Sequence, residues 1–243
     1  MRLRAIFFDA GNTLLRMNYA DIAAVLGRQG VTATVRDVQR AEWTARVRLD
    51  TDVLVNATST ESRDTHLRYL RYILEGLGVT DEATIAAVDA WRGAYNLPVG
   101  LWNTVDPDAA AALDAVHAAG VRSAVISNSN GTIRSLMAGV GLLDKLDFVI
   151  DSGEEGVEKP DPRIFEIALR RAGAKPEESA YIGDLYSIDV RGARSAGIRP
   201  VLLDPGRCWG PRDCDAAPTV LDAVRFLLRR EAWRTGNDGG RRR

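Results

Sequence analysis

Residues 5–15 read AIFFDAGNTLL, and this stretch decides the fold. Four apolar residues are followed at once by Asp9 and then by a glycine and polar residues. A short, continuous apolar run of this kind is typical of a strand buried on both faces of a parallel sheet. In such sheets, ligands bind beyond the carboxyl ends of the strands. The sequence therefore predicts a functional carboxylate at Asp9.

The same pattern recurs along the chain. Apolar runs at residues 123–126, 148–150, 180–182 and 200–203 predict four further strands. Segments 107–119, 132–138 and 162–172 are expected to be helices, because each is followed by a glycine and two begin with a proline. Alternating strands and helices indicate an α/β fold with a Rossmann-like, doubly wound parallel sheet as its core.

Residues 16–97 have a different character. They lack β-branched runs, and apolar residues such as Leu70, Ile73 and Leu74 recur at helical spacing. Roughly eighty residues are too many for a simple crossover, so we expect an inserted α-helical cap domain over 16–97. The core domain would then comprise residues 1–15 and 98–230. The polar segment 235–243 is expected to be a disordered tail.

Composition excludes several classes of function. The 243 residues, 46% of them hydrophobic, are enough to bury a core. With 32 basic and 33 acidic residues, no nucleic-acid or membrane partner is expected. Two cysteines and two histidines cannot build a structural zinc site or a disulfide scaffold. No apolar run approaches the roughly 18 residues of a membrane span. We therefore expect a cytoplasmic protein that acts on a small molecule.

Polar residues with complementary chemistry follow the predicted strands. They are Asp9 with Thr13, Ser127 with Asn128, Lys159, and Asp184 with Asp189. Carboxylate oxygens suit Mg²⁺, and a metal together with Lys159 would neutralise a phosphoryl group that Asp9 could attack. Two structural alternatives stay open. Ser127 and Asn128 could merely shape a turn, and the last two aspartates could merely favour a helix N-terminus.

Lysine is rare in this chain. Of the 32 basic residues, only Lys145, Lys159 and Lys175 are lysines. The planar fork of arginine does not replace a compact ammonium group. A lysine retained at position 159 therefore indicates a functional requirement.

Four motifs in sequence order resemble the haloacid dehalogenase-like hydrolase superfamily, in the form with a helical C1-type cap inserted after the first motif. They are FFDAGNTL at 7–14, VISNSNG at 125–131, GVEKPDPRIF at 156–165 and YIGDLYSIDVRGARSAG at 181–197. The resemblance spans about residues 3–225. It implies that Asp9 is the nucleophile and forms an aspartyl-phosphate, and that Lys159 neutralises charge. Ser127, with Asn128 and Thr13, would bind the phosphate.

The resemblance also implies Mg²⁺ as cofactor, bound by Asp9, Asp184 and the backbone carbonyl of Gly11, with Asp189 as a ligand or a support. Gly11 is the departure from the pattern. Phosphatases of the superfamily usually carry a second Asp there, which protonates the leaving group and then activates water. Loss of a positioned acid typically costs ~10²–10⁴ in rate. Alkyl phosphates should suffer most, and Gly11→Asp should help them. His66 in the expected cap is a candidate replacement.

The leading hypothesis is a Mg²⁺-dependent phosphatase that acts on a small phosphorylated metabolite. Gly11 favours one rival, a catalytically weak metal-binding regulatory protein of the same fold. A 2-haloacid dehalogenase is the other rival, but it needs no metal and usually lacks the acidic motif around Asp184. A phosphonatase depends on a cap lysine, and no lysine precedes Lys145. A phosphomutase needs the acid that Gly11 lacks.

Five cap residues could line a substrate pocket, although packing and surface roles are favoured for them. They are Trp43, Arg46, Arg48, Tyr69 and Trp91.

Overall fold

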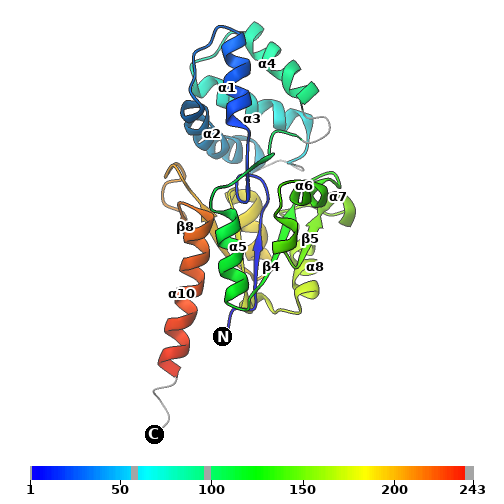
Figure 1. Ribbon diagram of the computed structural model, residues 1–243, viewed down its shortest axis with the longest axis vertical. Helices are drawn as coiled ribbons and strands as arrows, with labels where there is room; N and C mark the ends of the chain where they lie inside the picture. The colour runs from blue at the N-terminus through cyan, green and yellow to red at the C-terminus, as the bar shows by residue number, and fades with distance from the viewer. Residues whose placement is uncertain (1, 56–59, 96–99, 239–243) are drawn as a thin grey trace.

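The computed structural model describes residues 2–55, 60–95 and 100–238, and a parallel sheet lies at its centre (Figure 1). Its six strands run in the order β5-β4-β1-β6-β7-β8. They are β1 (Ala5–Phe8), β4 (Arg122–Ser127), β5 (Phe148–Asp151), β6 (Ser179–Gly183), β7 (Arg199–Leu203) and β8 (Asp215–Ala217). The first five confirm the predicted strands. The edge strand β8 has three residues and no apolar run, so periodicity does not detect it.

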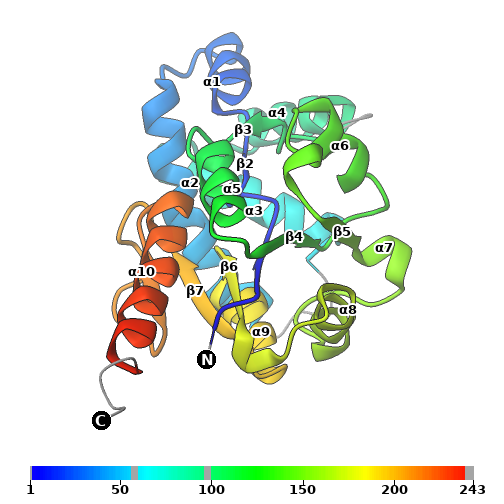
Figure 2. The ribbon, with the colours of Figure 1, turned by 60° about the horizontal axis from the view of Figure 1, so that its bottom comes forward.

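Helices cover both faces of the sheet (Figure 2). Ile6 and Phe8 share one cluster with α5 (Ala109–Ala118), α6 (Ile133–Gly139) and α10 (Val220–Asp238). Ala5 and Phe7 share another with α8 (Pro162–Ala172) and α9 (Arg191–Ser195). Successive side chains of a strand point to opposite faces, so a strand covered on both sides is apolar throughout. The expected Rossmann-like α/β core is confirmed.

Short elements complete the core. They are α7 (Ser152–Glu155) and the helical turns η2 (Leu143–Lys145), η3 (Pro176–Glu178) and η4 (Tyr186–Val190). Helix α10 continues to Asp238, and the expectation of a disordered tail over residues 235–243 stays a prediction. Extending an existing helix costs far less free energy than nucleating a new one. Polar residues can therefore continue α10 beyond its apolar part. Residues 239–243 lie outside the described residues.

Four helices pack together apart from the sheet, and we call them the cap helices (Figure 1). They are α1 (Tyr19–Arg28), α2 (Val35–Leu49), α3 (Arg63–Gly76) and α4 (Glu82–Tyr95), with the turn η1 (Asp50–Leu54) after α2. Their shared cluster includes Leu70, Ile73 and Leu74, all at most 3% exposed. The chain leaves the core at β2 (Leu15–Arg16) and returns at β3 (Thr104–Val105), which pair antiparallel. The exact division into core and cap domains stays a prediction.

A close helix contact yields a test of this packing. A Cβ atom on Gly192 of α9 would lie 2.7 Å from Cε2 of Phe165 in α8. Alanine normally stabilises a helix more than glycine does. Here its Cβ would overpack against Phe165, which costs about 1–3 kcal/mol. We expect Gly192→Ala to lower the free energy of unfolding measured by urea denaturation.

Gly93 of α4 is the matched control, because an added Cβ there meets nothing within 4 Å. Gly93→Ala should stabilise the protein by roughly 0.5–1 kcal/mol. Equal effects of the two substitutions would contradict the packing described for α8 and α9.

Candidate active site

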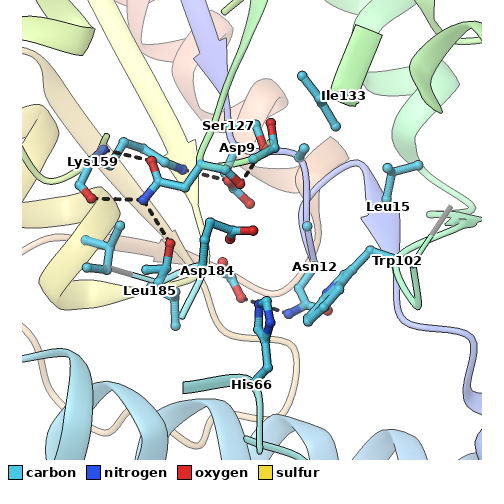
Figure 3. A pocket seen from close by; sticks show the side chains of 18 of the residues that line it. Asp9, Asn12, Leu15, His66, Trp102, Ser127, Ile133, Lys159, Asp184 and Leu185 are labelled. Atoms are coloured by element: carbon cyan, nitrogen blue, oxygen red, sulfur yellow. Dashed lines mark hydrogen bonds and ion pairs between the residues drawn. The ribbon is translucent and has the colours of Figure 1, made fainter. Parts of the chain in front are cut away.

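A cavity of about 290 Å³ lies between the carboxyl edge of the sheet and the cap helices (Figure 3). Because the strands are parallel, Asp9 after β1, Ser127 at the end of β4 and Asp184 after β6 meet at this edge. Thr65, His66 and Tyr69 of α3 line the cavity from the cap side. Residues far apart in the sequence therefore form one site.

The ammonium group of Lys159 is the centre of the site. Its side chain is 3% exposed, and Nζ donates to Oδ1 of Asp9 at 2.6 Å, Oδ1 of Asp189 at 2.8 Å and the hydroxyl of Tyr181 at 2.9 Å. An ammonium has three N–H donors, so each one has an acceptor. Burial opposes the charged form, but Asp189 and Asp9 outweigh it and raise the pKa of Lys159. Lys159 is therefore a fixed cation.

Asn128 holds the backbone of Lys159. Its Oδ1 accepts from the Lys159 N–H at 2.7 Å, and its Nδ2 donates to the Lys159 carbonyl and to Oγ1 of Thr60, each at 2.9 Å. A phosphate contact of the Asn128 side chain, expected from the sequence, would compete with these bonds. Ser127 lines the cavity, where its hydroxyl makes one long bond of 3.3 Å to the Asn128 carbonyl.

Thr13 is not where the sequence suggests. It is 1% exposed and is not among the cavity-lining residues. Its hydroxyl has no hydrogen-bond partner in the described part of the chain. The tight turn after β1 accounts for this, because the N–H groups of Thr13 and Leu14 both bond back to the Ala10 carbonyl. A direct contact of Thr13 with the phosphate stays a prediction, and the burial of its side chain does not favour it.

Both oxygens of Asp189 are engaged. Oδ1 accepts from Lys159 and from Tyr181, and Oδ2 accepts from the backbone N–H groups of Asp184 and Leu185. A Cβ atom on Gly183 would lie 2.4 Å from Cγ of Asp189, so only glycine allows this approach. Asp189 thus positions Lys159 and the turn that carries Asp184.

Tyr181 is not among the site residues that the sequence predicts. Its hydroxyl connects Lys159 to Asp189, and its ring is completely buried. The available signal is a tyrosine inside a strand buried on both faces, because a buried phenol usually needs a hydrogen-bond partner.

Three carboxylates form a group that could hold a cation. Oxygens of Asp9, Asp184 and Asp189 lie within 4.8 Å of one another. Burial raises the pKa of Asp9 to about 6, although Lys159 opposes the shift. Burial also raises the pKa of Asp184 well above its ordinary value, although Arg46 opposes it.

The buried network around these carboxylates contains fewer basic than acidic side chains. The described buried network holds four acidic side chains, those of Asp9, Asp184, Asp189 and Glu42, and two basic ones, those of Lys159 and Arg46. A single divalent cation supplies the two missing positive charges. Buried charges are tolerated when they are paired or bind a metal, so the residues present fit Mg²⁺.

Arg46 enters the network from the cap. It donates to both oxygens of Glu42, which is 0% exposed, at 2.8 and 2.7 Å. Its Nη1 lies 3.3 Å from Oδ2 of Asp184 without a hydrogen bond in the described chain. Glu42 also accepts from the hydroxyls of Tyr19 and Tyr69. A cap helix thereby contacts the acidic group.

The other cap candidates divide clearly. Tyr69 lines the cavity, whereas Trp43, Arg46, Arg48 and Trp91 do not. Arg48 is half-exposed and pairs with Glu75. Trp91 packs against Tyr95 with ring centroids 4.9 Å apart. A surface role therefore accounts for Arg48, and a packing role accounts for Trp91.

Trp102 occupies the space beside Gly11. A Cβ atom on Gly11 would lie 3.3 Å from Cδ1 of the indole, and Nε1 of Trp102 donates to Oδ1 of Asn12 at 3.0 Å. Asn12 adopts a left-handed backbone with φ of 54° and donates to Oδ2 of Asp184 at 3.2 Å. The sequence does not predict Trp102 as a site residue, because this contact exists only in the folded protein. An acidic side chain could enter at position 11 only if the indole moved.

His66 points into the cavity toward Asp184 and Asn12 (Figure 3). Its ring lies 6.3 Å from that of Trp102. Burial and the nearby Arg92 lower the pKa of His66, which makes it a neutral imidazole at neutral pH.

Comparison with known proteins identifies relatives of the whole chain. A model of the haloacid dehalogenase-like hydrolase family matches residues 3–197. The haloacid dehalogenase-like hydrolase domain-containing protein 3 of Danio rerio is 36% identical over 210 residues, which cover 83% of this chain and 85% of that protein. None of the described helices is long and apolar enough to cross a membrane.

Two further likenesses are narrower. A phosphoserine phosphatase of Thermus thermophilus is 42% identical over 115 residues, which cover 47% of this chain and 45% of that enzyme. The chain thus matches less than half the length of that phosphatase. A hydrolase from Bacillus subtilis, solved with bound magnesium, has a TM-score of 0.62 at 16% identity and covers 94% of this chain and 100% of that one. This likeness shows the fold alone.

The raised pKa of Asp9 makes metal binding depend on pH. A proton occupies this carboxyl below about pH 6, and a metal must displace it. The ordinary pKa is 3.8, so the metal-free fold binds more protons than the unfolded chain between these values and loses stability as pH rises through them. We expect Mg²⁺ to raise the melting temperature more at about pH 7.5 than at about pH 5.

Asp184→Asn is the control for this measurement and should abolish the Mg²⁺ shift at both pH values. An equal Mg²⁺ shift in the wild type and in this variant would contradict the placement of the cation.

Proposed function

The chain belongs to the haloacid dehalogenase-like hydrolases, and we propose that it is a Mg²⁺-dependent phosphatase that acts on a small phosphorylated metabolite. One observation carries the proposal. The carboxylate of Asp9 faces the cavity with Lys159 bonded to one of its oxygens and Asp184 beside it. The helical cap over residues 16–97 and a cytoplasmic location are parts of the same proposal.

Asp9 performs the first step. Its carboxylate attacks phosphorus, an O–P bond forms, and the bond from phosphorus to the ester oxygen breaks, which leaves an aspartyl-phosphate. Lys159 holds Oδ1 of Asp9, so the nucleophile is oriented before the substrate arrives. Asp9, Asp184 and the carbonyl of Gly11 would hold Mg²⁺, which when bound polarises a phosphoryl oxygen and offsets negative charge.

The remaining residues position or stabilise. The Ser127 hydroxyl can donate to a phosphoryl oxygen, because its one long bond is easily exchanged. Asp189 and Tyr181 fix the ammonium of Lys159. In the second step, water attacks the aspartyl-phosphate and releases phosphate and the free Asp9 carboxylate. No carboxyl group at position 11 assists the proton transfers, so a leaving group of low basicity reacts fastest.

The test is a screen of phosphate esters with Mg²⁺. Wild type should hydrolyse aryl and acyl phosphates faster than alkyl phosphates, and Asp9→Asn should lower turnover at least about 10³-fold. Asp114→Asn is the matched control, because Asp114 is exposed on α5 and its ion pair in the described chain is with Lys145, away from the cavity. Turnover at the level of Asp9→Asn for every ester would contradict the phosphatase proposal and favour the regulatory alternative.

A chloride-release assay with 2-chloropropionate separates the dehalogenase alternative. Its carboxylate substrate would enter a group of carboxylates that already lacks positive charge. We therefore expect no release above background.

The contact between Gly11 and Trp102 changes the expectation for Gly11→Asp. Because the indole lies 3.3 Å from the new Cβ, this substitution alone should not raise turnover of alkyl phosphates. The double substitution Gly11→Asp with Trp102→Ala makes room for the acid. We expect it to increase the ratio of alkyl to aryl turnover, relative to wild type, by up to the ~10²-fold that a positioned acid supplies. A gain from the single substitution would show that the indole is no barrier.

A further inference from the structure

Positive charge in the cavity is confined to one residue. Among its described lining residues, Lys159 is the single lysine or arginine. All three N–H donors of Lys159 are taken by Asp9, Asp189 and Tyr181. Asp184 and Glu61 also line the cavity, and burial raises the pKa of Glu61 to about 7. Lys159 and one bound divalent ion therefore balance the acidic group, and the described lining offers no further lysine or arginine to a second anion.

Neighbouring cations are held outside the cavity. Arg46 lies behind Asp184 and is tied to both oxygens of Glu42. Arg92 lies behind His66 and pairs with Asp89 at 2.9 Å. His66 itself points into the cavity as a neutral ring, because burial and Arg92 lower its pKa. A second anionic group on a substrate would therefore meet no counter-charge.

One side of the wall is apolar, while polar side chains such as Thr60, Thr65 and Asn130 line other parts. In the view of Figure 3, Leu15, Trp102 and Ile133 stand together on the side away from Lys159. The indole of Trp102 is stacked with Tyr69, with ring centroids 6.1 Å apart. Further apolar lining comes from Leu49, Leu54, Leu101, Leu136, Leu185 and Ile188. The apolar side of the wall stabilises an apolar group of a substrate.

We propose that the site selects monophosphates whose leaving group is uncharged and apolar, such as an aryl group, and rejects those with a second anion. This rests on the proposed function and names its substrate class. It agrees with the glycine at position 11, because a phenolate leaves readily without a general acid.

Three esters with one aromatic frame test the proposal. Phenyl phosphate, 4-carboxyphenyl phosphate and 4-(aminomethyl)phenyl phosphate differ mainly in the charge carried at the far end of the ring. We expect kcat/KM for the carboxylate ester to be at least about tenfold below that of phenyl phosphate. Calorimetric binding of phenylphosphonate and 4-carboxyphenylphosphonate to the wild type with Mg²⁺ should follow the same order.

Variants at Glu61 test whether charge at this position causes the discrimination between the two esters. Glu61→Lys should raise the relative kcat/KM of the carboxylate ester about tenfold, and the milder Glu61→Gln should shift it in the same direction. Asp64→Lys is the matched control, because Asp64 is exposed on α3 and does not line the cavity. The ratio for Asp64→Lys should equal that of the wild type.

The outcomes separate this proposal from the proposed function. If the carboxylate ester and phosphonate perform as well as the uncharged ones, the substrate class is wrong while Asp9-dependent turnover stands. If no ester is hydrolysed but the uncharged phosphonate still binds more tightly, the selection holds and the phosphatase proposal fails.

Discussion

The site depends on the burial of the Lys159 ammonium among three acceptors from two segments of the chain. Asp9 follows β1, while Tyr181 and Asp189 belong to β6 and the turn η4 after it. A buried charge is stable only when its hydrogen bonds are complete. The same requirement fixes Gly183, because any side chain there would displace Asp189. The parallel sheet brings these groups to one edge, and the ammonium then sets their geometry.

Charge balance connects the core to the cap. Arg46 and Glu42 of α2 are buried beside Asp184, so a cap helix contributes to the electrostatics of the acidic group. The network is two positive charges short, which favours a divalent ion, and burial raises the pKa values of Asp9 and Asp184. The described cavity wall adds leucines and an indole, and it contains no lysine or arginine besides Lys159. Acidic floor and apolar wall together point to a substrate with one phosphate.

Local patterns in the sequence predict much of this structure. The five apolar runs become strands, and Asp9, Ser127 and Asp184 meet because strand ends share an edge. Lys159 joins them from the segment between α7 and α8. Long-range contacts explain what was not predicted. Trp102 contacts Gly11 although the cap helices separate the two residues in the sequence. Thr13 is a local case, because the backbone N–H groups of Thr13 and Leu14 bond to the Ala10 carbonyl while the Thr13 side chain is buried. Asn128 has a side chain that could bind phosphate, yet its amide group forms hydrogen bonds with the backbone of Lys159.

The central claim is that Asp9 becomes phosphorylated during turnover. The most direct measurement is rapid acid quenching during hydrolysis of an aryl phosphate with Mg²⁺, followed by mass spectrometry of the peptide that contains Asp9. We predict a phosphoryl group on Asp9 that accumulates in the first turnover and disappears when the substrate is exhausted. Sustained hydrolysis with an unmodified Asp9 at every quench time, and with undiminished rate in Asp9→Asn, would contradict the account.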